Sequence, residues 1–564
     1  MLQHDVIVVG GGLAGMRAAL EAKRRHADVA LISKVHPVRS HSVAAQGGIN
    51  APLGQSDTWE SHAYDTVKGS DYLGDQDAIE ALSREAAQAV VDLENMGVAF
   101  YRGPDGRLAP RNFGGASTAR TYFVGAITGH AILHVMYEQL LRAGVKIYEE
   151  WFVTSLVNEG GFTAGLVAQE LLTGRFHPIQ AKAIILCTGG CGRVYEPSTN
   201  ALICTGDGMS LAWRAGAPLM DMEMVQYHPT TLPSNGALMT EGARGDGAYL
   251  RNALGDRFMS KYAPNKLELA SRDVVSRAEQ VEIDEGRGVD DGLGAKSCVY
   301  LDCTHLPREF ILERLGEIYE IARQFANVDI TTQPVPVRPG MHYMMGGIKT
   351  NVDGRTRVPG LYAAGECACV SVHGGNRLGA NSLLDTVIFG RRAGAHAAEF
   401  ARQVEFRPLS EGAVLDSERR AQEVLGRPAN GDSIAKVRME LGQTMHQYAG
   451  VWRDGKGLNT ALSRIYSLKE RYQRAPVQDK GKVFNTNLVF HWELGYMLDN
   501  AEAILVSAIH RTESRGAHYR TDCPERDDQS WLKHIVLDYR PGAAPGIQYA
   551  PVTITRWKPE KRVY

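Results

Sequence analysis

The sequence predicts an α/β fold, in which a Rossmann-like nucleotide-binding domain receives an inserted α+β capping domain and is followed by a helical domain and an extended C-terminal tail. Three observations predict it. A glycine-rich strand–turn–helix opens the chain, two later apolar strands end in small residues, and helical spacing prevails beyond residue 398. The 564 residues are too many for one hydrophobic core, and a chain of this length is expected to form about two to four domains.

The first predicted element is a buried strand over 5–9 that turns through glycines into a helix over 16–25. The glycines follow the pattern G-x-G-x-x-G, which in this context is typical of dinucleotide binding. We expect Gly10 to permit the tight turn, Gly12 to let the backbone approach a pyrophosphate, and Gly15 to let helix and strand pack closely. The N-terminus of the helix then offers free N–H groups to the phosphates.

The second strand leaves the nucleotide undecided. It covers 28–32, is followed by Ser33 and Lys34, and lacks the acidic residue that usually binds ribose. A serine can also hydrogen-bond a ribose, so the motif alone does not separate NAD from FAD. The stretch 34–49 is polar, then small, then Gly-Gly, which suits a loop wrapped closely around a ligand.

Two later strands favour FAD. The segments 183–187 and 360–364 are apolar and run into glycine-containing turns. Nucleotide-contacting pieces at 10–48 and 360–390 thus flank an insertion. That layout suits FAD, which is long and held extended, better than a nicotinamide held by one Rossmann unit. Glu366 is expected on the ribityl or phosphate side of the flavin.

Changes of pattern divide the chain into parts. A proline-rich stretch at 334–339 marks the return from the insertion. The predicted domains are an FAD-binding domain at 1–235 and 335–397, a capping domain at 236–334, a helical domain at 398–515 and a C-terminal tail at 516–564. Apolar residues at helical spacing predict helices at 76–96, 125–143, 458–472 and 488–512, and another after a cap at Asp432 or Ser433.

Composition argues against several classes of protein. An apolar content of 44% and a charged content of 22% are ordinary for a soluble globular protein. A net charge of −2 gives no reason to expect nucleic acid or an anionic membrane as a direct partner. No apolar run approaches the length of about 18 residues that marks a membrane-spanning helix. The fold begins by residue 5, which leaves no room for a signal peptide, so we expect a cytoplasmic protein, free or seated on a membrane-embedded partner.

The eight cysteines do not follow a metal-binding pattern. Cys187 and Cys191 are spaced CxxxC, Cys367 and Cys369 are spaced CxC, and no paired CxxC occurs. We therefore expect buried free thiols rather than zinc or iron–sulfur ligands. A protein of this kind that handles electrons must pass them to another molecule.

Four groups of polar residues around the insertion suit a small dicarboxylate. They lie at 226–230, at 239–247, at 270–273, and at 341–347 together with 373–383. Taken singly, a histidine is usually a structural hydrogen-bonding group, and Arg272 next to Asp273 is usually a surface ion pair. Together the groups place histidines, a threonine hydroxyl and several arginines near glycines and a flavin. Arginine binds a carboxylate through a bidentate fork, while histidine and threonine orient it.

These motifs resemble the flavoprotein subunits of succinate dehydrogenase and fumarate reductase, the complex II family. The resemblance runs from the glycine fingerprint to a tail motif, and its most specific stretches are 39–42, 228–230, 240–242, 271–273, 376–379 and 512–518. It implies oxidation of succinate to fumarate by hydride transfer to FAD. It also implies an iron–sulfur subunit that receives the electrons, a membrane anchor that reduces a quinone, and a peripheral position on the cytoplasmic face of the inner membrane.

The resemblance implies roles residue by residue. FAD is linked through its 8α-methyl to His41, which should raise the flavin's reduction potential as oxidation of a CH₂–CH₂ bond requires. Arg272 exchanges the substrate proton and is fed through Glu241 and Arg244. The dicarboxylate is bound by His228, Thr240, His342 and Arg377. The other FAD positions are Gly10, Gly12, Gly15, Ser33, Lys34, Ser40, Ser42, Gln46, Gly47, Gly48, Asp207, Glu366, Ser382 and Leu383. An alkali cation held by backbone carbonyls is implied near Met345 and Glu366, and no other metal is expected.

The direction of the reaction is less defined than the family. Gln46 resembles the succinate-oxidising members, whereas some fumarate reductases carry glutamate there and other quinol-linked ones also have glutamine. Arginine normally keeps its proton in proteins. Arg272 therefore suits an acid for fumarate reduction better than a base for succinate oxidation, and fumarate reduction stays the alternative.

Three rival functions are weighed against this interpretation. L-aspartate oxidase is a soluble relative with non-covalent FAD, and His41 and the long tail argue against it. A flavin-binding carrier subunit without chemistry predicts damage at His228, Arg272, His342 or Arg377, and all four are intact. An FAD-dependent tRNA-modifying protein would need a basic face, which the net charge does not favour.

Overall fold

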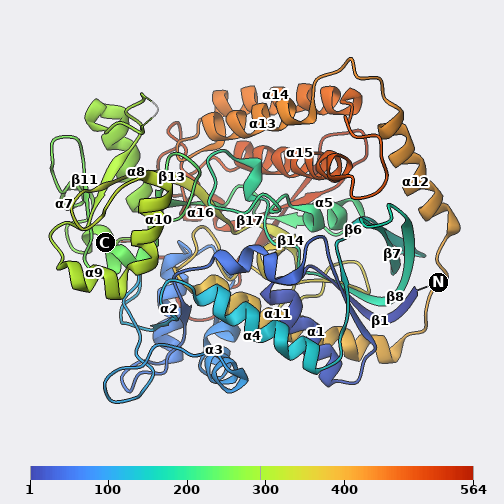
Figure 1. Cartoon of the computed structure of the whole chain (residues 1–564), viewed down its shortest axis with the longest axis horizontal. Helices are drawn as coiled ribbons and strands as arrows, with labels where there is room; N and C mark the ends of the chain where they lie inside the picture. Colours follow the sequence, from blue (N-terminus) through green and yellow to red (C-terminus); the bar gives the residue numbers. More distant parts are fainter. Residues whose placement is uncertain (1, 293, 563–564) are drawn as a thin grey trace.

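The computed structural model describes residues 2–292 and 294–562 and is built around a largely parallel sheet (Figure 1). Its strands are β1 (Leu2–Val9), β2 (Val29–Ser33), β5 (Lys146–Glu149), β6 (Trp151–Glu159), β7 (Phe162–Glu170), β8 (Phe176–Leu186) and β15 (Leu361–Ala363). The strand order is β5-β2-β1-β8-β7-β6, and β15 also pairs with β8. β1, β2, β5, β8 and β15 run parallel, whereas β6 and β7 form an antiparallel edge.

Helices cover this sheet because its central strands are apolar on both faces. Val6 and Val8 of β1 join one hydrophobic cluster, whereas Ile7 and Val9 join another, so successive side chains enter opposite cores. The first cluster is completed by α1 (Leu13–Arg24), α3 (Gln76–Met96), α4 (Thr128–Arg142) and α11 (Asn381–Gln403). The helices predicted at 76–96 and 125–143 are thereby confirmed, the second with a start at Thr128. Nearby lie α2 (Trp59–Gly69), β3 (Ile49–Asn50) and β4 (Thr121–Tyr122).

A second sheet carries the inserted segment, drawn in green at the left of Figure 1. Its strands are β10 (Val225–Thr231), β11 (Tyr249–Arg251), β12 (Val299–Asp302) and β13 (Val335–Met344), in the antiparallel order β10-β13-β12-β11. Its helices are α6 (Glu241–Gly245), α7 (Met259–Tyr262), α8 (Arg272–Glu282), α9 (Arg308–Arg314) and α10 (Gly316–Ala326). Buried apolar side chains between Leu232 and Val337 form a hydrophobic cluster of their own.

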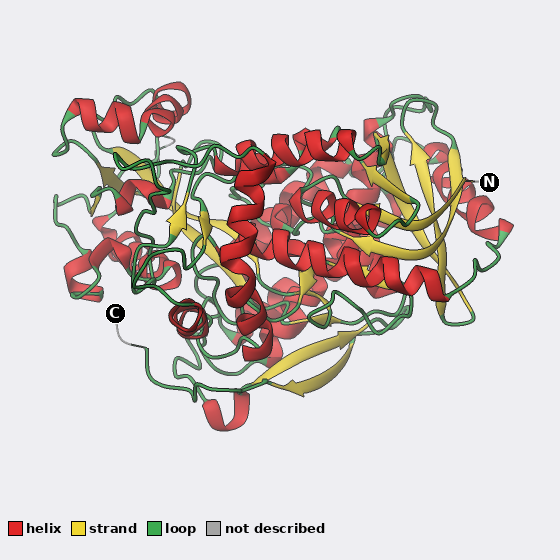
Figure 2. Cartoon of the chain, turned by 90° about the horizontal axis from the view of Figure 1, so that it is seen from below, coloured by secondary structure: helices red, strands yellow, loops and turns green. Residues whose placement is uncertain are grey.

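The region beyond residue 403 is mainly helical, with its long helices labelled α12 to α15 in Figure 1; Figure 2 draws the helices of the whole chain in red and the strands in yellow. It contains α12 (Glu411–Gly426), α13 (Ile434–Ala449), α14 (Gly455–Arg474) and α15 (Thr486–His510). Ser433 is the N-cap of α13 and accepts a hydrogen bond from the backbone N–H of Lys436. α15 is buried on nearly every side, against α14 and α5 (Asp207–Arg214). Across the described part of the chain, no helix combines the length and apolar character needed to cross a bilayer.

The C-terminal segment is extended over much of its length but also contains elements that the sequence analysis did not predict. These are α16 (Asp528–Trp531) and a hairpin of β17 (Lys533–Asp538) and β18 (Gly546–Pro551). β17 pairs with β9 (Leu219–Met220) and extends a sheet that also holds β14 (Gly347–Lys349) and β16 (Ala368–Cys369). The apolar run of β17 is short, and its partner β9 lies far away in the sequence, so neither periodicity nor local turn signals indicate this pairing.

Candidate active site

A cavity of about 420 Å³ lies at the carboxyl ends of β1, β2, β8 and β15. In an open α/β sheet this edge is where ligands bind. The predicted FAD residues that line the cavity are Gly10, Gly12, Ser33, Lys34, Ser40, His41, Ser42, Gln46, Gly47, Gly48, Asp207, Glu366, Ser382 and Leu383. Gly15 does not line it.

The fingerprint glycines are required by close packing. Gly10 has φ +116°, and a Cβ on it would lie 2.1 Å from the carbonyl oxygen of Cys187. A Cβ on Gly15 would lie 1.9 Å from the carbonyl oxygen of Gly10, so Gly15 allows α1 to approach the turn. Gly12 differs, because the atoms nearest to its Cβ would be side-chain atoms, the Ser42 hydroxyl at 3.2 Å and Ser40 at 3.8 Å. Gly12 therefore keeps the cavity wall open to a ligand.

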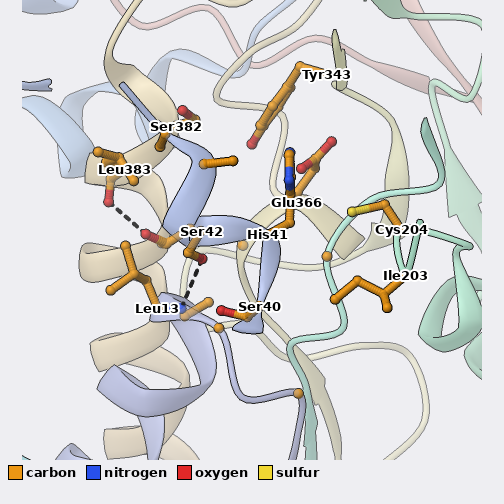
Figure 3. Close-up of a pocket in the computed structure, with 18 of the residues that line it drawn as sticks. Leu13, Ser40, His41, Ser42, Ile203, Cys204, Tyr343, Glu366, Ser382 and Leu383 are labelled. Carbon is orange, nitrogen blue, oxygen red and sulfur yellow. Dashed lines mark hydrogen bonds between the residues drawn. The ribbon is translucent and has the colours of Figure 1, made fainter. Parts of the chain in front are cut away.

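Two helices present their N-terminal ends to the cavity. The N–H of Leu13 in the first turn of α1 donates to the Oγ of Ser42 over 3.2 Å (Figure 3). Ser382 and Leu383 lie in the first turn of α11. Both helix ends carry partial positive charge. The buried Oγ of Ser40 has no hydrogen-bond partner among the described residues. This wall fits the pyrophosphate of an FAD molecule.

Lys34 connects the cavity to the helical region. Its Nζ donates to Asp207 Oδ2 and to Glu493 Oε1, each over 2.6 Å. Burial lowers the pKa of Lys34, but the carboxylates of Asp207 and Glu493 outweigh burial and leave the pKa above its ordinary value. Lys34 is therefore cationic at the nucleotide end. Glu493 was not predicted, because a contact between residues so far apart leaves no local sequence signal.

His41 and Glu366 lie beside each other in the cavity (Figure 3). The backbone N–H of Ala201 donates to Nδ1 of His41 over 3.3 Å. Burial, assisted by Arg193, lowers the pKa of His41 to about 4, so the ring is neutral at neutral pH. Because Nδ1 is an acceptor, Nε2 is the ring atom left for a ligand. Burial also raises the pKa of Glu366 to about 7.

Met345 and Glu366, the two residues implied for an alkali cation, are linked by a hydrogen bond from the backbone next to Met345. The N–H of Met344, next to Met345, donates to Glu366 Oε1 over 3.0 Å. Within the described ranges, no group of three or more His, Cys, Asp or Glu residues is arranged to hold a metal ion. Seven of the eight cysteines are buried and Cys523 is partly exposed, in line with the prediction of buried free thiols.

A second set of cavity-lining residues comes from the inserted segment and its surroundings. It consists of His228, Thr240, Glu241, Arg272, His342 and Arg377. Antiparallel pairing of β10 with β13 places the rings of His228 and His342 edge-on, 4.9 Å apart. Thr240 caps α6 through its Oγ1, and Arg272 begins α8. The polar groups that are dispersed in the sequence thus meet at one place.

Arg272 and Arg377 are held by one shared acceptor. Gln226 Oε1 accepts from Nη1 of Arg272 and from Nη2 of Arg377, each over 3.0 Å. Nε of Arg272 donates to Glu241 Oε2 over 2.7 Å. Sequence reasoning gave Gln226 no role of its own. A signal was present, since Gln226 and His228 are two residues apart on one strand and so share a face.

The set is positively charged and contains buried donors without partners. The pKa values of His228 and His342 are held well below the ordinary value, mainly by burial and next by the positive charge of Arg272. Burial and Arg272 also lower the pKa of Arg377 to about 9, which leaves it cationic at neutral pH. His228 Nε2 and Arg377 Nε lack hydrogen-bond partners among the described residues. Buried polar groups of this kind call for a bound anion.

Arg244 lies behind this set and does not line the cavity. Its Nη2 is 3.8 Å from Glu241 Oε2, and its Nη1 donates to the carbonyl oxygen of Glu268 over 2.6 Å. Burial raises the pKa of Glu241, but Arg272 and Arg244 outweigh burial and hold it below the ordinary value. Arg272, Glu241 and Arg244 thus form a buried row. The surface ion pair considered for Arg272 and Asp273 is not formed, since both residues are buried and Arg272 pairs with Glu241.

Comparison with known proteins identifies the family. A protein-family model described as "FAD binding domain" matches residues 5–383, and a second family model, described as "Fumarate reductase flavoprotein C-term", matches residues 438–564. The fumarate reductase flavoprotein subunit of Mycobacterium tuberculosis is 46% identical over 100% of this chain and 99% of its own length. The succinate dehydrogenase flavoprotein subunit of Rickettsia bellii is 45% identical over 100% of this chain and 98% of its own length.

A solved structure agrees with these matches. A variant of the E. coli quinol fumarate reductase subunit FrdA superposes with a TM-score of 0.96 at 40% identity, covering 100% of this chain and 99% of that one. Fold and site define an FAD-dependent oxidoreductase. The chain belongs to the complex II family of succinate dehydrogenase and fumarate reductase flavoprotein subunits. The predicted fold class is confirmed.

Proposed function

We propose that this chain is the flavoprotein subunit of a succinate:quinone oxidoreductase and oxidises succinate to fumarate. The observation that carries the proposal is the buried group of Arg272, Arg377 and His228, which is cationic and has unsatisfied donors beside an FAD cradle. A small dicarboxylate supplies two negative charges that such a site needs. Enclosure in a low-dielectric site strengthens their attraction to the arginines.

Each side chain has a separate task in binding. The backbone N–H of Thr230 donates to Nδ1 of His228, so the neutral ring carries its proton on Nε2. That Nε2–H and the free Nε–H of Arg377 donate to carboxylate oxygens of the substrate. His342 and Thr240 orient the molecule. These contacts fix which carbon faces Arg272.

FAD, when bound, supplies the acceptor for the hydride. Arg272 exchanges the proton of the adjacent carbon, and its bonds to Glu241 and Gln226 hold the guanidinium in one orientation. Glu241, kept ionised by its two arginine neighbours, passes the proton between Arg272 and Arg244. This row lets the substrate carbon exchange protons inside a site that excludes water.

We infer a covalent bond between FAD and Nε2 of His41. In support, Ala201 already occupies Nδ1, so a ring substituted at Nε2 keeps its observed hydrogen bond. The test is flavin fluorescence in a denaturing gel of natively purified protein. A fluorescent band is expected, and His41→Ala should give yellow protein with a dark band. His36→Ala, at a partly exposed histidine that does not line the cavity, is the control.

A dark band from wild-type protein that was yellow before denaturation would contradict the covalent bond. That result would favour the L-aspartate oxidase alternative, which oxidation of aspartate would then test. The other alternative, quinol:fumarate reduction, has its support in the names of the relatives, which are divided between the two directions. The ratio of succinate oxidation to fumarate reduction in native membranes tests the direction, and a ratio below one would contradict our proposal.

For partners, we infer an iron–sulfur subunit that receives the electrons and a membrane anchor that passes them to a quinone. In support, the structural relative is named a quinol fumarate reductase. The chain would then sit peripherally on the cytoplasmic face of the inner membrane. Purification of the native complex from membranes, with iron analysis and identification of each subunit, tests these partners.

A further inference from the structure

Glu279 is a buried carboxyl group that the proposed function leaves unused. It lies on α8, seven positions after Arg272, so about two helical turns place both side chains on one face. Its relative exposure is 0%, and neither carboxyl oxygen has a hydrogen-bond partner among the described residues. A carboxyl group buried in this way is unfavourable. Its presence therefore needs an explanation.

Arg244 has unsatisfied hydrogen-bond donors that match the unsatisfied acceptors of Glu279. Its Nε and Nη2 are buried donors without an acceptor among the described residues. Arg244 is the charged group that acts on the pKa of Glu279, and Glu279 is second only to Glu241 among the charges that act on the pKa of Arg244. The unsatisfied donors of Arg244 and the unsatisfied acceptors of Glu279 thus belong to two buried groups that act on each other, and a water molecule between them would satisfy both. Cys298 is a further titratable group that Glu279 influences.

We propose that Glu279 is the next proton carrier beyond Arg244, so that the row Arg272–Glu241–Arg244 continues to Glu279. The inference rests on the proposed function, since it adds a step to the same proton path. Glu279 does not line the cavity. It acts on the substrate only through Arg244, at the end of the row that is remote from the substrate.

Each step along the row moves one proton and no electron. In fumarate reduction, Arg272 gives a proton to the substrate carbon and regains one through Glu241 from Arg244. Arg244 then takes the proton of the Glu279 carboxyl group, which remains a carboxylate until water protonates it. Succinate oxidation runs the same transfers backward. Burial raises the pKa of Glu279 well above its ordinary value, against the opposing effect of Arg244, and so favours the protonated form that the row draws on.

The test uses the FAD-loaded holoenzyme with Glu279→Gln, which keeps the shape of the side chain but cannot release a proton. We expect kcat to fall by about 10²-fold, the lower end of the range for a lost proton-transfer group. KM and flavin content should stay unchanged, and the solvent deuterium isotope effect on kcat should rise. Glu279→Asp, which keeps the carboxyl group, should recover part of the rate.

The matched control is Glu282→Gln, on the same helix and equally buried. Glu282 is bonded to Arg287 and Asn252, outside the row, so this variant should keep the wild-type kcat and isotope effect. Glu279→Gln with the wild-type kcat and isotope effect would overturn the proposal. Equal losses of activity and flavin in both variants would also overturn it, because they assign the effect to the packing of α8.

A second measurement does not depend on turnover. Infrared difference spectra on fumarate binding should contain a carboxylic-acid C=O band that is missing in Glu279→Gln, and identical spectra of the two proteins would overturn the proposal. Wild-type holoenzyme inactive on both succinate and fumarate would contradict the proposed function itself. An active wild type with an equally active Glu279→Gln contradicts only the role of Glu279.

Discussion

At the scale of single residues, the site depends on arginines that share their hydrogen-bond acceptors. Arg272 is held by Glu241 and Gln226, and Arg377 is held by Gln226 and lies 4.5 Å from the centre of the Tyr343 ring. Two acceptors, Glu241 and Gln226, serve the N–H groups of both arginines. Because there are fewer acceptors than N–H groups, part of each guanidinium stays free for a ligand. The arrangement binds anions strongly because the donors are oriented in advance.

Replacement of Arg272 tests its part in proton exchange. Arg272→Gln should lower kcat for both directions by about 10²- to 10⁴-fold, the range typical of a lost acid or base group. FAD should stay bound, because the FAD cradle is formed by other residues. Arg272→Lys keeps the charge but loses the planar fork and should be intermediate. Steady-state rates and flavin absorbance per protein check this, and a Gln variant with substantial turnover would rule out the role.

The sequence predicted which residue types gather in the site but not how they are connected. His228, Arg272 and Arg377 were singled out from their chemistry and from the family motifs. Gln226, the acceptor that Arg272 and Arg377 share, and the bond between Lys34 and Glu493 were not predicted. Hydrogen bonds between distant segments depend on tertiary structure, and a single sequence without an alignment carries no record of them.

At the scale of elements, the contact between α1 and β1 positions the nucleotide end of the site. Gly15→Ala would place a Cβ 1.9 Å from the carbonyl oxygen of Gly10, which is backbone and cannot turn aside. We expect the free energy of unfolding to fall by about 1–3 kcal/mol, as for overpacked cores, with reduced flavin content. Chemical denaturation and flavin absorbance measure both effects.

The control for this variant is Gly316→Ala. Gly316 is the first residue of α10, and an added Cβ meets nothing within 4 Å. Its free energy of unfolding should change by less than about 0.5 kcal/mol, as for ordinary surface substitutions. Comparable losses in both variants would contradict the packing argument for Gly15.

Elements with strong periodicity were predicted well, and elements defined by pairing were not. Helices expected at 458–472 and 488–512 appear as α14 and α15. The first helix begins at Leu13 rather than Met16, because the glycine turn ends earlier than the apolar pattern indicates. The hairpin of β17 and β18 was missed, since its apolar run is short and β17 also pairs with β9, which lies far away in the sequence.

At the scale of the whole molecule, His534 joins the C-terminal hairpin to the nucleotide-binding core. Its Nδ1 is 2.7 Å from Asp221 Oδ2, and its Nε2 is 3.3 Å from Asp75 Oδ1. Burial lowers the pKa of His534, but Asp221 and Asp75 outweigh burial and raise it to about 10. The unfolded chain has an ordinary histidine pKa of about 6.5.

The difference between the folded and unfolded pKa of His534 determines how its contribution to stability changes with pH. Because the folded-state pKa is the higher one, the stabilisation is complete below about pH 6.5 and is lost as the pH rises toward about 10. Relative to His534→Gln, wild-type protein should gain most unfolding free energy at about pH 6 and little near pH 10. Urea unfolding across this range checks the prediction, and a pH-independent difference would contradict it.

Arg562 makes a second long-range connection. Its Nε is 3.1 Å from Asp71 Oδ1, and its Nη2 is 2.8 Å from Asp273 Oδ2, next to Arg272. Arg562→Ala should lower the free energy of unfolding by about 2 kcal/mol, a typical value for a lost charged hydrogen bond. Lys561→Ala, at the exposed neighbour, is the control. Denaturant titration measures both, and equal stabilities would argue against a structural role for Arg562.

The connection through Arg562 also sets an order of events during biosynthesis. Asp71 and Asp273 leave the ribosome early, whereas their shared arginine is added only after nearly three hundred further residues have been translated. Until then the start of α8 lacks one of its positive neighbours. The nascent chain therefore cannot form this contact before position 562 has been translated. A chain truncated just before position 562 should lack the ion pairs of Arg562 with Asp71 and Asp273 while it keeps every other element described above.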